Sequence, residues 1–206
     1  MKRKPVVVIM GTDGAGKTTL LNAALPEVEE RLGKKFVVHH LKPDFLPPLG
    51  RLRGVRHEAG YVCRDPHGSK PSGSIGSLLR ITYLTADYVL GYWLKVRRTI
   101  RRDQVAGWIF DRYAYDLLLD PRRFRIQLPG WIIRSYLAVI PKPDRIICLG
   151  GDPAKIFSRK PETSLECVTH QVEKLRAFAD ADSRAVWIDT TQPLEASVQK
   201  FREALA

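Results

Sequence analysis

The chain alternates short apolar runs with longer stretches in which apolar residues recur at helical spacing. Five runs rich in Val, Ile or Phe have the length of strands and lie at 5–10, 35–40, 106–111, 144–150 and 184–188. Helical spacing predicts helices at 17–31, 75–102, 129–138, 153–158, 164–180 and 193–205. Strands that alternate with helices are typical of α/β proteins, because a crossover helix returns the chain to a parallel neighbour. We therefore expect a parallel sheet of these five strands with helices on both faces.

The stretch 42–74 differs from the rest because it has little periodicity. It carries five prolines and five glycines, which is typical of turns and irregular structure. A connection of this length inside a compact domain usually serves a function. We find no repeat and no linker-like composition, so the sequence predicts one domain over 1–206 with an irregular segment at about 42–74.

A glycine-rich loop joins the first predicted strand to the first predicted helix. Residues 11–18 match the complete G-x-x-x-x-G-K-[ST] pattern of the Walker A motif, or P-loop. Glycines let the backbone curl so that successive N–H groups point at a phosphate, and the helix that follows adds its N-terminal dipole. Lys17 is expected to reach the β- and γ-phosphates of ATP, and the Thr18 hydroxyl to hold Mg²⁺. The predicted nucleotide site consists of Gly11, Thr12, Asp13, Gly14, Ala15, Gly16, Lys17, Thr18 and Thr19.

The composition is that of a globular protein of the cytoplasm. Apolar residues make up 44% and charged residues 27% of the chain, and no stretch approaches the roughly 20 apolar residues of a membrane-spanning helix. The basic N-terminus precedes an apolar run that is too short for a signal peptide. The three cysteines are widely spaced and form no C-x-x-C pair, as expected in a reducing compartment.

The formal net charge of +12 is larger than two anionic kinase substrates require. A nucleic acid, an anionic membrane surface, a phosphorylated glycan or simple solvation of helix faces would each account for the excess of cations. The sequence has no N-K-x-D motif and no basic stripe interleaved with aromatic residues, which disfavours a nucleotide switch or a nucleic-acid-binding module. The arginines cluster at 51, 53 and 56, at 97, 98, 101 and 102, and at 122, 123 and 125.

Four segments, in the same order, resemble the thymidylate kinase family of nucleoside monophosphate kinases. Residues 11–19 resemble the family's G-x-D-x-x-G-K-T-T loop, and 110–115 resemble the "DRY" segment that follows its third strand. Residues 141–146 resemble the P-K-P-D that leads into its fourth strand, and 64–69 are a looser match to R-E-P-G-G-T. Because order and spacing agree over nearly the whole chain, the resemblance implies a three-layer P-loop kinase fold.

The resemblance also implies roles for individual residues. Asp13 would accept a hydrogen bond from a hydroxyl of the acceptor's sugar, and Asp111 would hold Mg²⁺ directly or through water. Arg64 and Arg112 would contact the acceptor phosphate, and Tyr113 would also bind the acceptor substrate. The sequence leads to the same placement for Asp111 and Arg112, because ligands of parallel sheets bind at the carboxyl ends of the strands.

Phosphoryl transfer needs cations around the moving group more than it needs a base. In this family an arginine is supplied either by the P-loop or by a short lid over ATP. Gly14 stands at the P-loop position, so the resemblance assigns this role to a lid at about 157–164, with Arg159 as first candidate and Lys160 as second.

The acceptor side departs from the family's pattern. Leu84 stands where the family has a phenylalanine that stacks on thymine, and Tyr88 stands where it has an arginine that pairs with the acceptor. The family's residues after the "DRY" segment are also replaced, at 116–123. These changes leave open which acceptor is used.

The leading hypothesis is an ATP- and Mg²⁺-dependent kinase of a nucleoside monophosphate, by default dTMP to dTDP. An alternative is a kinase of a non-nucleotide acceptor, such as a sugar or a lipid-linked glycan in polysaccharide biosynthesis. The family's habit of dimerising through helices beside the acceptor site makes a homodimer an expectation as well. Peripheral contact with an anionic membrane stays open, through the amphipathic stretch 128–137.

Overall fold

The computed structural model describes residues 4–47, 73–101 and 104–205. The chain divides into two compact units. Unit 1 contains residues up to 41, 99–113 and 142–206, and unit 2 contains 42–98 and 114–141. The prediction of one kinase domain over the whole chain stays a prediction.

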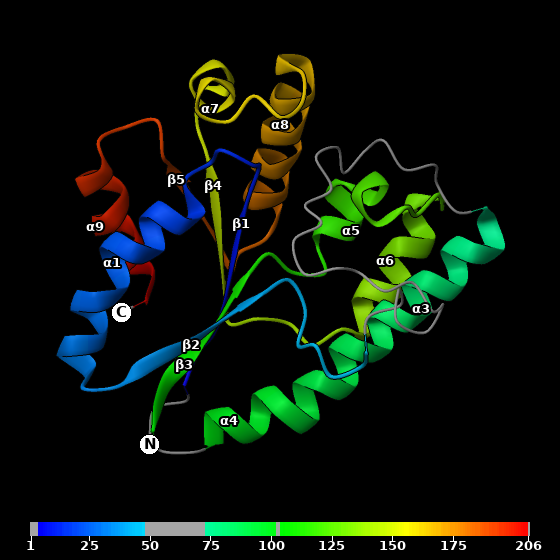
Figure 1. The fold of residues 1–206 in the computed structure, drawn as a ribbon, viewed down its shortest axis with the longest axis horizontal. Helices are drawn as coiled ribbons and strands as arrows, with labels where there is room; N and C mark the ends of the chain where they lie inside the picture. The colour runs from blue at the N-terminus through cyan, green and yellow to red at the C-terminus, as the bar shows by residue number, and fades with distance from the viewer. Residues whose placement is uncertain (1–3, 48–72, 102–103, 206) are drawn as a thin grey trace. The chain divides into compact units, whose positions relative to one another are not determined.

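Unit 1 is built on a five-stranded sheet in the order β2-β3-β1-β4-β5, in which every neighbouring pair is parallel (Figure 1). All six residues of the central strand β1 are buried, because it has a strand on either side and helices above and below. The predicted five-stranded parallel α/β sheet is confirmed. The strands are β1 (Val6–Gly11), β2 (Lys35–His40), β3 (Val105–Asp111), β4 (Arg145–Gly150) and β5 (Ala185–Asp189).

Helices cover both faces of this sheet. Figure 1 shows α1 and α9 on one side of it and α8 on the other. Alternate strand residues such as Val7 and Ile9 pack with Leu20 of α1 and Phe201 of α9 in one buried cluster. The bounds are α1 (Lys17–Leu32), α7 (Pro153–Arg159), α8 (Leu165–Ala181) and α9 (Leu194–Leu205).

Unit 2 is helical. Its long element follows the predicted helix at 75–102 but contains a π-helical segment directly after Gly91. A Cβ atom at Gly91 would lie only 2.4 Å from the Pro43 Cβ, so the glycine lets the segment after β2 pack directly on the helix. The elements are α3 (Ser74–Gly91), η1 (Tyr92–Val96), α4 (Arg97–Arg101, which continues into unit 1), α5 (Asp116–Leu119), η2 (Pro121–Phe124) and α6 (Gly130–Val139).

A fully buried carboxylate fixes the segment 42–47 to α3. Asp87 Oδ1 accepts hydrogen bonds from the backbone N–H groups of Phe45 (2.8 Å) and Leu46 (2.7 Å). Its Oδ2 lies 2.5 Å from the ammonium of Lys42. Burial lowers the pKa of Lys42, but Asp87 and Asp44 outweigh that effect and raise this pKa above its usual value. Asp87 is therefore a satisfied structural anchor.

No helix among the described residues is long and apolar enough to cross a membrane.

Candidate active site

The P-loop lies at the carboxyl end of β1, where the order of the strands reverses. The chain passes from β1 to β2 on one side of the sheet, and later from β3 to β4 across β1 to the other side. In open parallel sheets, ligands bind outside the carboxyl ends of the strands at this kind of switch point. All residues of the phosphate-binding half described below belong to unit 1.

The loop has the backbone conformation that its glycines predict. Gly14 (φ 84°) and Gly16 (φ 78°) adopt left-handed conformations, which glycine adopts without a steric penalty. The side chain of Lys17 is folded into the loop, where its Nζ donates to the carbonyl oxygens of Gly11 and Thr12, both at 2.9 Å. A largely buried ammonium is thus held at the amino end of α1, where helix dipole and backbone N–H groups also favour a phosphate.

Asp111 ends β3 and lies in register with Ile9 of β1 and His40 of β2. Its Oδ2 is 3.3 Å from His40 Nδ1. Burial raises the pKa of Asp111, but the hydrogen bond with His40 and the charges of Lys17 and Arg112 outweigh it and hold this pKa below the usual 3.8. Asp111 is therefore an ionised carboxylate close enough to Lys17 to feel its charge.

Two buried oxygens in this region have no hydrogen-bond partner among the described residues: Asp111 Oδ1 and Thr12 Oγ1. A buried, unpaired carboxylate oxygen is costly unless a ligand, ion or water uses it. Carboxylate and hydroxyl oxygens are ligands that Mg²⁺ prefers, and one or two protein ligands suffice where phosphates and waters complete the shell. The expected pair of Asp111 and the exposed Thr18 therefore fits Mg²⁺. No group of three or more His, Cys, Asp or Glu in the described part of the chain could hold a metal.

Asp13 and Arg112, both expected at the acceptor, lie against each other. Arg112 Nη2 is 2.5 Å from Asp13 Oδ1, and the arginine is only 6% exposed. Its backbone has φ 74°, a conformation that is strained for a residue with a side chain. Its N–H nevertheless donates to Ile9 O at 2.8 Å, so the strained backbone is held firmly at β1. The ion pair ties the P-loop to the end of β3.

The two candidate lid cations, Arg159 and Lys160, occupy different positions. A Cβ atom at Gly14 would lie 2.7 Å from Ile156 O and 3.3 Å from Lys160 Cβ, so the P-loop touches α7 and the start of the lid. The Lys160 ammonium is exposed and 3.1 Å from Glu162. The Arg159 guanidinium instead donates to the Thr190 carbonyl at 2.9 Å, in the turn after β5. Lys160 is therefore the candidate whose Cβ lies next to Gly14, although its ammonium is paired with Glu162.

Three of the remaining expected site residues, Tyr113, Leu84 and Tyr88, are among the residues that the structure describes. Tyr113 is 2% exposed and packs on Phe110, with 5.2 Å between ring centroids. Leu84 is half-buried and Tyr88 is 2% exposed, both on α3 in unit 2. Arg64 lies outside the described residues.

Two residues of this region were missed from the sequence: His40 beside Asp111, and Thr190 beside the P-loop. The Thr190 Cβ lies 4.0 Å from where a Cβ at Gly16 would be. His40 is the last residue of one predicted strand and Thr190 lies two residues after another, so the rule that ligands bind at the carboxyl ends of parallel strands would have pointed to them.

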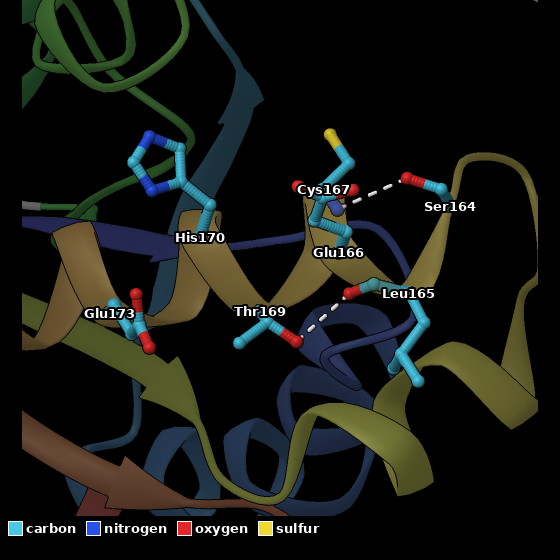
Figure 2. Close-up of a pocket in the computed structure, with 7 residues that line it drawn as sticks. All are labelled: Ser164, Leu165, Glu166, Cys167, Thr169, His170 and Glu173. Carbon is cyan, nitrogen blue, oxygen red and sulfur yellow. Dashed lines mark hydrogen bonds between the residues drawn. The ribbon is translucent and has the colours of Figure 1, made fainter.

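A hollow of about 800 Å³ lies along the first turns of α8. Figure 2 shows its lining side chains projecting from the first turns of that helix, with Ser164 Oγ accepting from the Cys167 N–H at 3.2 Å as the helix cap. Among the described lining residues Glu166 and Glu173 are acidic and none is Lys or Arg, so this hollow is unsuited to phosphate. The lining residues are Ser164, Leu165, Glu166, Cys167, Thr169, His170 and Glu173.

No protein-family model matches the sequence, and no curated protein matches it either. Among solved structures, the chain is similar to a thymidylate kinase from Ehrlichia chaffeensis, with a TM-score of 0.61 over 98% of each chain. The two sequences are 12% identical, so the likeness is one of fold. The protein therefore has a thymidylate kinase-like fold, as the resemblance of the motifs predicted.

Proposed function

We propose that this protein is a P-loop kinase that transfers the γ-phosphoryl group of ATP to a phosphate-bearing acceptor, by default the nucleoside monophosphate dTMP. The observation that supports this most directly is the pairing of two features at adjacent strand ends. Lys17 is held inside a glycine loop at the end of β1, and an ionised Asp111 with an unpaired oxygen ends β3. The thymidylate kinase-like fold adds support by analogy.

In this proposal the chain's own residues stabilise charge during phosphoryl transfer. The N–H groups of the loop and the amino end of α1 bind the β-phosphate, and Lys17 neutralises charge that develops between the β- and γ-phosphates. Lys160, next to Gly14, supplies the lid cation. Asp111 and Thr18 would hold Mg²⁺, which would supply positive charge at the phosphate oxygens.

The acceptor needs no general base, because a phosphate acceptor already carries negative charge near neutral pH. Arg112 is the cation that the proposal assigns to this acceptor phosphate. Asp13 holds its guanidinium at 2.5 Å and so limits the directions in which Arg112 can point. Residence in the cytoplasm, where ATP is available, belongs to the same proposal.

The direct test is ADP release from Mg-ATP with a panel of nucleoside monophosphates. We expect turnover with at least one of them, and none with the Lys17→Ala variant. The exposed Lys200 provides a matched control, since Lys200→Ala removes the same side chain far from the loop and should keep the native rate. Equal turnover of Lys17→Ala and the native protein would contradict the P-loop assignment.

A kinase of a non-nucleotide phosphate, such as a sugar phosphate or a lipid-linked glycan, is the second candidate. It is favoured by the positions on α3 that correspond to the family's thymine-stacking aromatic and acceptor arginine. These residues are Leu84 and Tyr88. Tyr88 is 2% exposed, so its ring is part of the buried core. If no nucleoside monophosphate stimulates ADP release, while the protein still binds ATP and phosphorylates a sugar phosphate, this candidate is supported and dTMP is excluded as the acceptor.

A further inference from the structure

The last residue of β2, His40, lies beside the carboxylate of Asp111 at the end of the neighbouring strand β3 (Figure 1). The two residues are in register, and His40 Nδ1 is 3.3 Å from Asp111 Oδ2. The histidine side chain is 64% exposed and the aspartate side chain only 20%, so an accessible ring contacts a largely buried carboxylate. The phosphoryl transfer proposed above gives this ring no role.

The alternation of side chains along the strands places His40 and Asp111 on the side of the sheet that α1 covers. Phe36 of β2 and Ile109 of β3 belong to the buried cluster that contains residues of α1. His40 lies four residues after Phe36 and Asp111 two residues after Ile109, so all four side chains project to the same side. The charge of Lys17, at the amino end of α1, also acts on Asp111. His40 is therefore on the side of the sheet that carries the phosphate site.

The direction of the hydrogen bond between the two side chains follows from their chemistry. Asp111 is ionised near neutral pH, since its pKa lies below the usual 3.8. An ionised carboxylate can only accept hydrogen bonds, so Nδ1 of His40 carries the proton and donates it to Oδ2. This bond restricts rotation of the carboxylate about its Cβ–Cγ bond and so fixes the direction of Oδ1.

The backbone on both sides of Asp111 is fixed as well. The Leu41 N–H donates to the Asp111 carbonyl oxygen at 2.8 Å, and the Arg112 N–H donates to the Ile9 carbonyl oxygen at 2.8 Å. Leu41 has φ 63°, a conformation that is strained for a residue with a side chain and persists only where its surroundings hold it. The residue that follows His40 is therefore bonded to Asp111, which keeps ring and carboxylate together.

The contact with His40 satisfies only half of the Asp111 carboxylate. Oδ2 accepts from His40, whereas Oδ1 is buried and has no hydrogen-bond partner in the described part of the chain. Asp87, the structural anchor of unit 2, has partners at both of its oxygens. A carboxylate that is held at one oxygen and unpaired at the other is suited to a ligand and not only to a structural contact.

On the basis of the proposed function, in which Asp111 is a ligand of Mg²⁺, we propose that His40 is a positioning residue for that ligand. By donating to Oδ2, His40 holds the carboxylate in one orientation and leaves Oδ1 for the metal. Side chains that hydrogen-bond to metal ligands typically change metal affinity or activity by about 10–100-fold when they are replaced. His40 itself contacts neither substrate nor metal in this role.

The test measures the affinity of Mn²⁺, a paramagnetic substitute for Mg²⁺, for the complex of the full chain with ADP. Both ions prefer oxygen ligands, and the electron paramagnetic resonance signal of free Mn²⁺ is lost on binding. Protein in excess over ADP keeps free nucleotide from competing for the ion. His40→Leu should weaken Mn²⁺ binding about tenfold. ADP binding in EDTA, measured by calorimetry, should stay native, because the phosphate loop is unchanged.

The variant His40→Asn is the matched partner of His40→Leu. Asn and Leu have similar shapes, but only Asn carries a donor nitrogen bonded to Cγ, where histidine carries Nδ1. His40→Asn should therefore bind Mn²⁺ almost as well as the native chain. His39→Leu controls for the loss of a histidine, since His39 projects to the opposite side of β2, with its ring centroid 5.9 Å from that of Trp108. This control should keep native Mn²⁺ affinity.

The kinetic counterpart of this loss is a change in the Mg²⁺ requirement. In His40→Leu the Mg²⁺ concentration for half-maximal ADP release should rise about tenfold, while kcat at saturating Mg²⁺ stays close to native. Circular dichroism checks folding of each variant. If His40→Leu does not fold, His40→Ala takes its place in the comparison with His40→Asn.

Native Mn²⁺ affinity in His40→Leu would overturn the proposal, and so would equal weakening by Leu and Asn, because shape and not the donor would then matter. If the native complex with ADP binds no Mn²⁺, the assignment of Asp111 as a metal ligand fails and the role of His40 fails with it. If the Leu and Asn variants differ as expected but no acceptor is phosphorylated, the role of His40 is supported and the proposed transfer reaction is wrong. The two proposals can therefore fail separately.

Discussion

The phosphate-binding half of unit 1 and the α3 helix of unit 2 both place charged residues out of solvent, but they satisfy them differently. In unit 1, Asp111 keeps a buried oxygen without a hydrogen-bond partner, beside the charge of Lys17. In unit 2, Asp87 is more deeply buried, yet it accepts two backbone hydrogen bonds and pairs with Lys42. An incompletely satisfied buried charge indicates a place for a ligand, whereas a fully satisfied one indicates a structural anchor.

The largest effect is expected from removing the cation of the phosphate-binding half. Lys17→Ala should lower turnover by at least about a thousandfold, because the variant loses the charge that offsets the developing phosphate charge. ADP release measures the loss, and thermal unfolding should stay close to that of the native chain. A variant that unfolds many degrees lower would instead give Lys17 a structural role like that of Asp87.

The converse change removes the anchor of unit 2. Asp87→Ala should lower the free energy of unfolding by about 3–5 kcal/mol, because Lys42 and two N–H groups lose their partner in the interior. Urea unfolding measures the total. Hydrogen exchange should show lost protection at 42–47 and along α3, while β1 and β3 stay protected.

A double variant tests the cause of that loss. Lys42→Met with Asp87→Leu should recover part of the stability, since no charge is then left unpaired, although the N–H groups of Phe45 and Leu46 still lack an acceptor. If the double variant is less stable than Asp87→Ala, the cost lies in packing and not in the unpaired ammonium.

We expect the two candidate lid cations of the phosphate-binding half to affect different kinetic constants. Lys160→Ala should lower kcat about a hundredfold, because Lys160 lies next to Gly14. Arg159→Ala should mainly raise the KM for ATP, because Arg159 holds the Thr190 carbonyl in the turn beside the P-loop. Steady-state kinetics of both variants make the comparison, and a reversed pattern would return the catalytic role to Arg159.

A smaller effect is expected at a satisfied pair in unit 1 that lies outside the site. Arg184 binds Asp182 through its side chain and its N–H; these hydrogen bonds, opposed by partial burial, lower the pKa of Asp182 below 3.8. Asp182→Asn should cost about 1–2 kcal/mol near neutral pH. A carboxylate whose pKa is lower in the folded than in the unfolded chain stabilises the fold only while it is ionised. The difference in stability between the native chain and the variant should therefore disappear as the pH falls through the folded-state pKa of Asp182. Urea midpoints across this range check the sign.

Most of the fold could be predicted because apolar runs and helical spacing are local signals. Each strand begins within one residue of its predicted start, and the helix predicted at 17–31 is observed as Lys17–Leu32. The short elements α5 and η2 were missed, since four residues are too few to show a period. The π-helical segment after Gly91 was missed as well. So was the packing of Pro43 against Gly91, because the two residues are 48 positions apart in the chain.

The candidate site was predictable to the extent that it depends on motifs. The P-loop conformation and the nearness of Asp111 to Lys17 follow from a contiguous pattern and from strand ends that meet in a parallel sheet. The pairing of Asp13 with Arg112 was not predicted, because it joins residues 99 positions apart. The roles of Arg64 and of the acceptor-side residues stay predictions.

The sheet, the glycine loop and the chemistry of a phosphate site could therefore be read from the chain, because they depend on local spacing and on glycines that allow the backbone conformation. Which charges are satisfied became clear from the tertiary structure. It showed that Asp87 is an anchor, that Asp111 has an unpaired oxygen, that the Lys160 Cβ lies next to Gly14, and that Ile75 and Leu79 of α3 are exposed. These properties depend on partners distant in the chain, which no local pattern encodes.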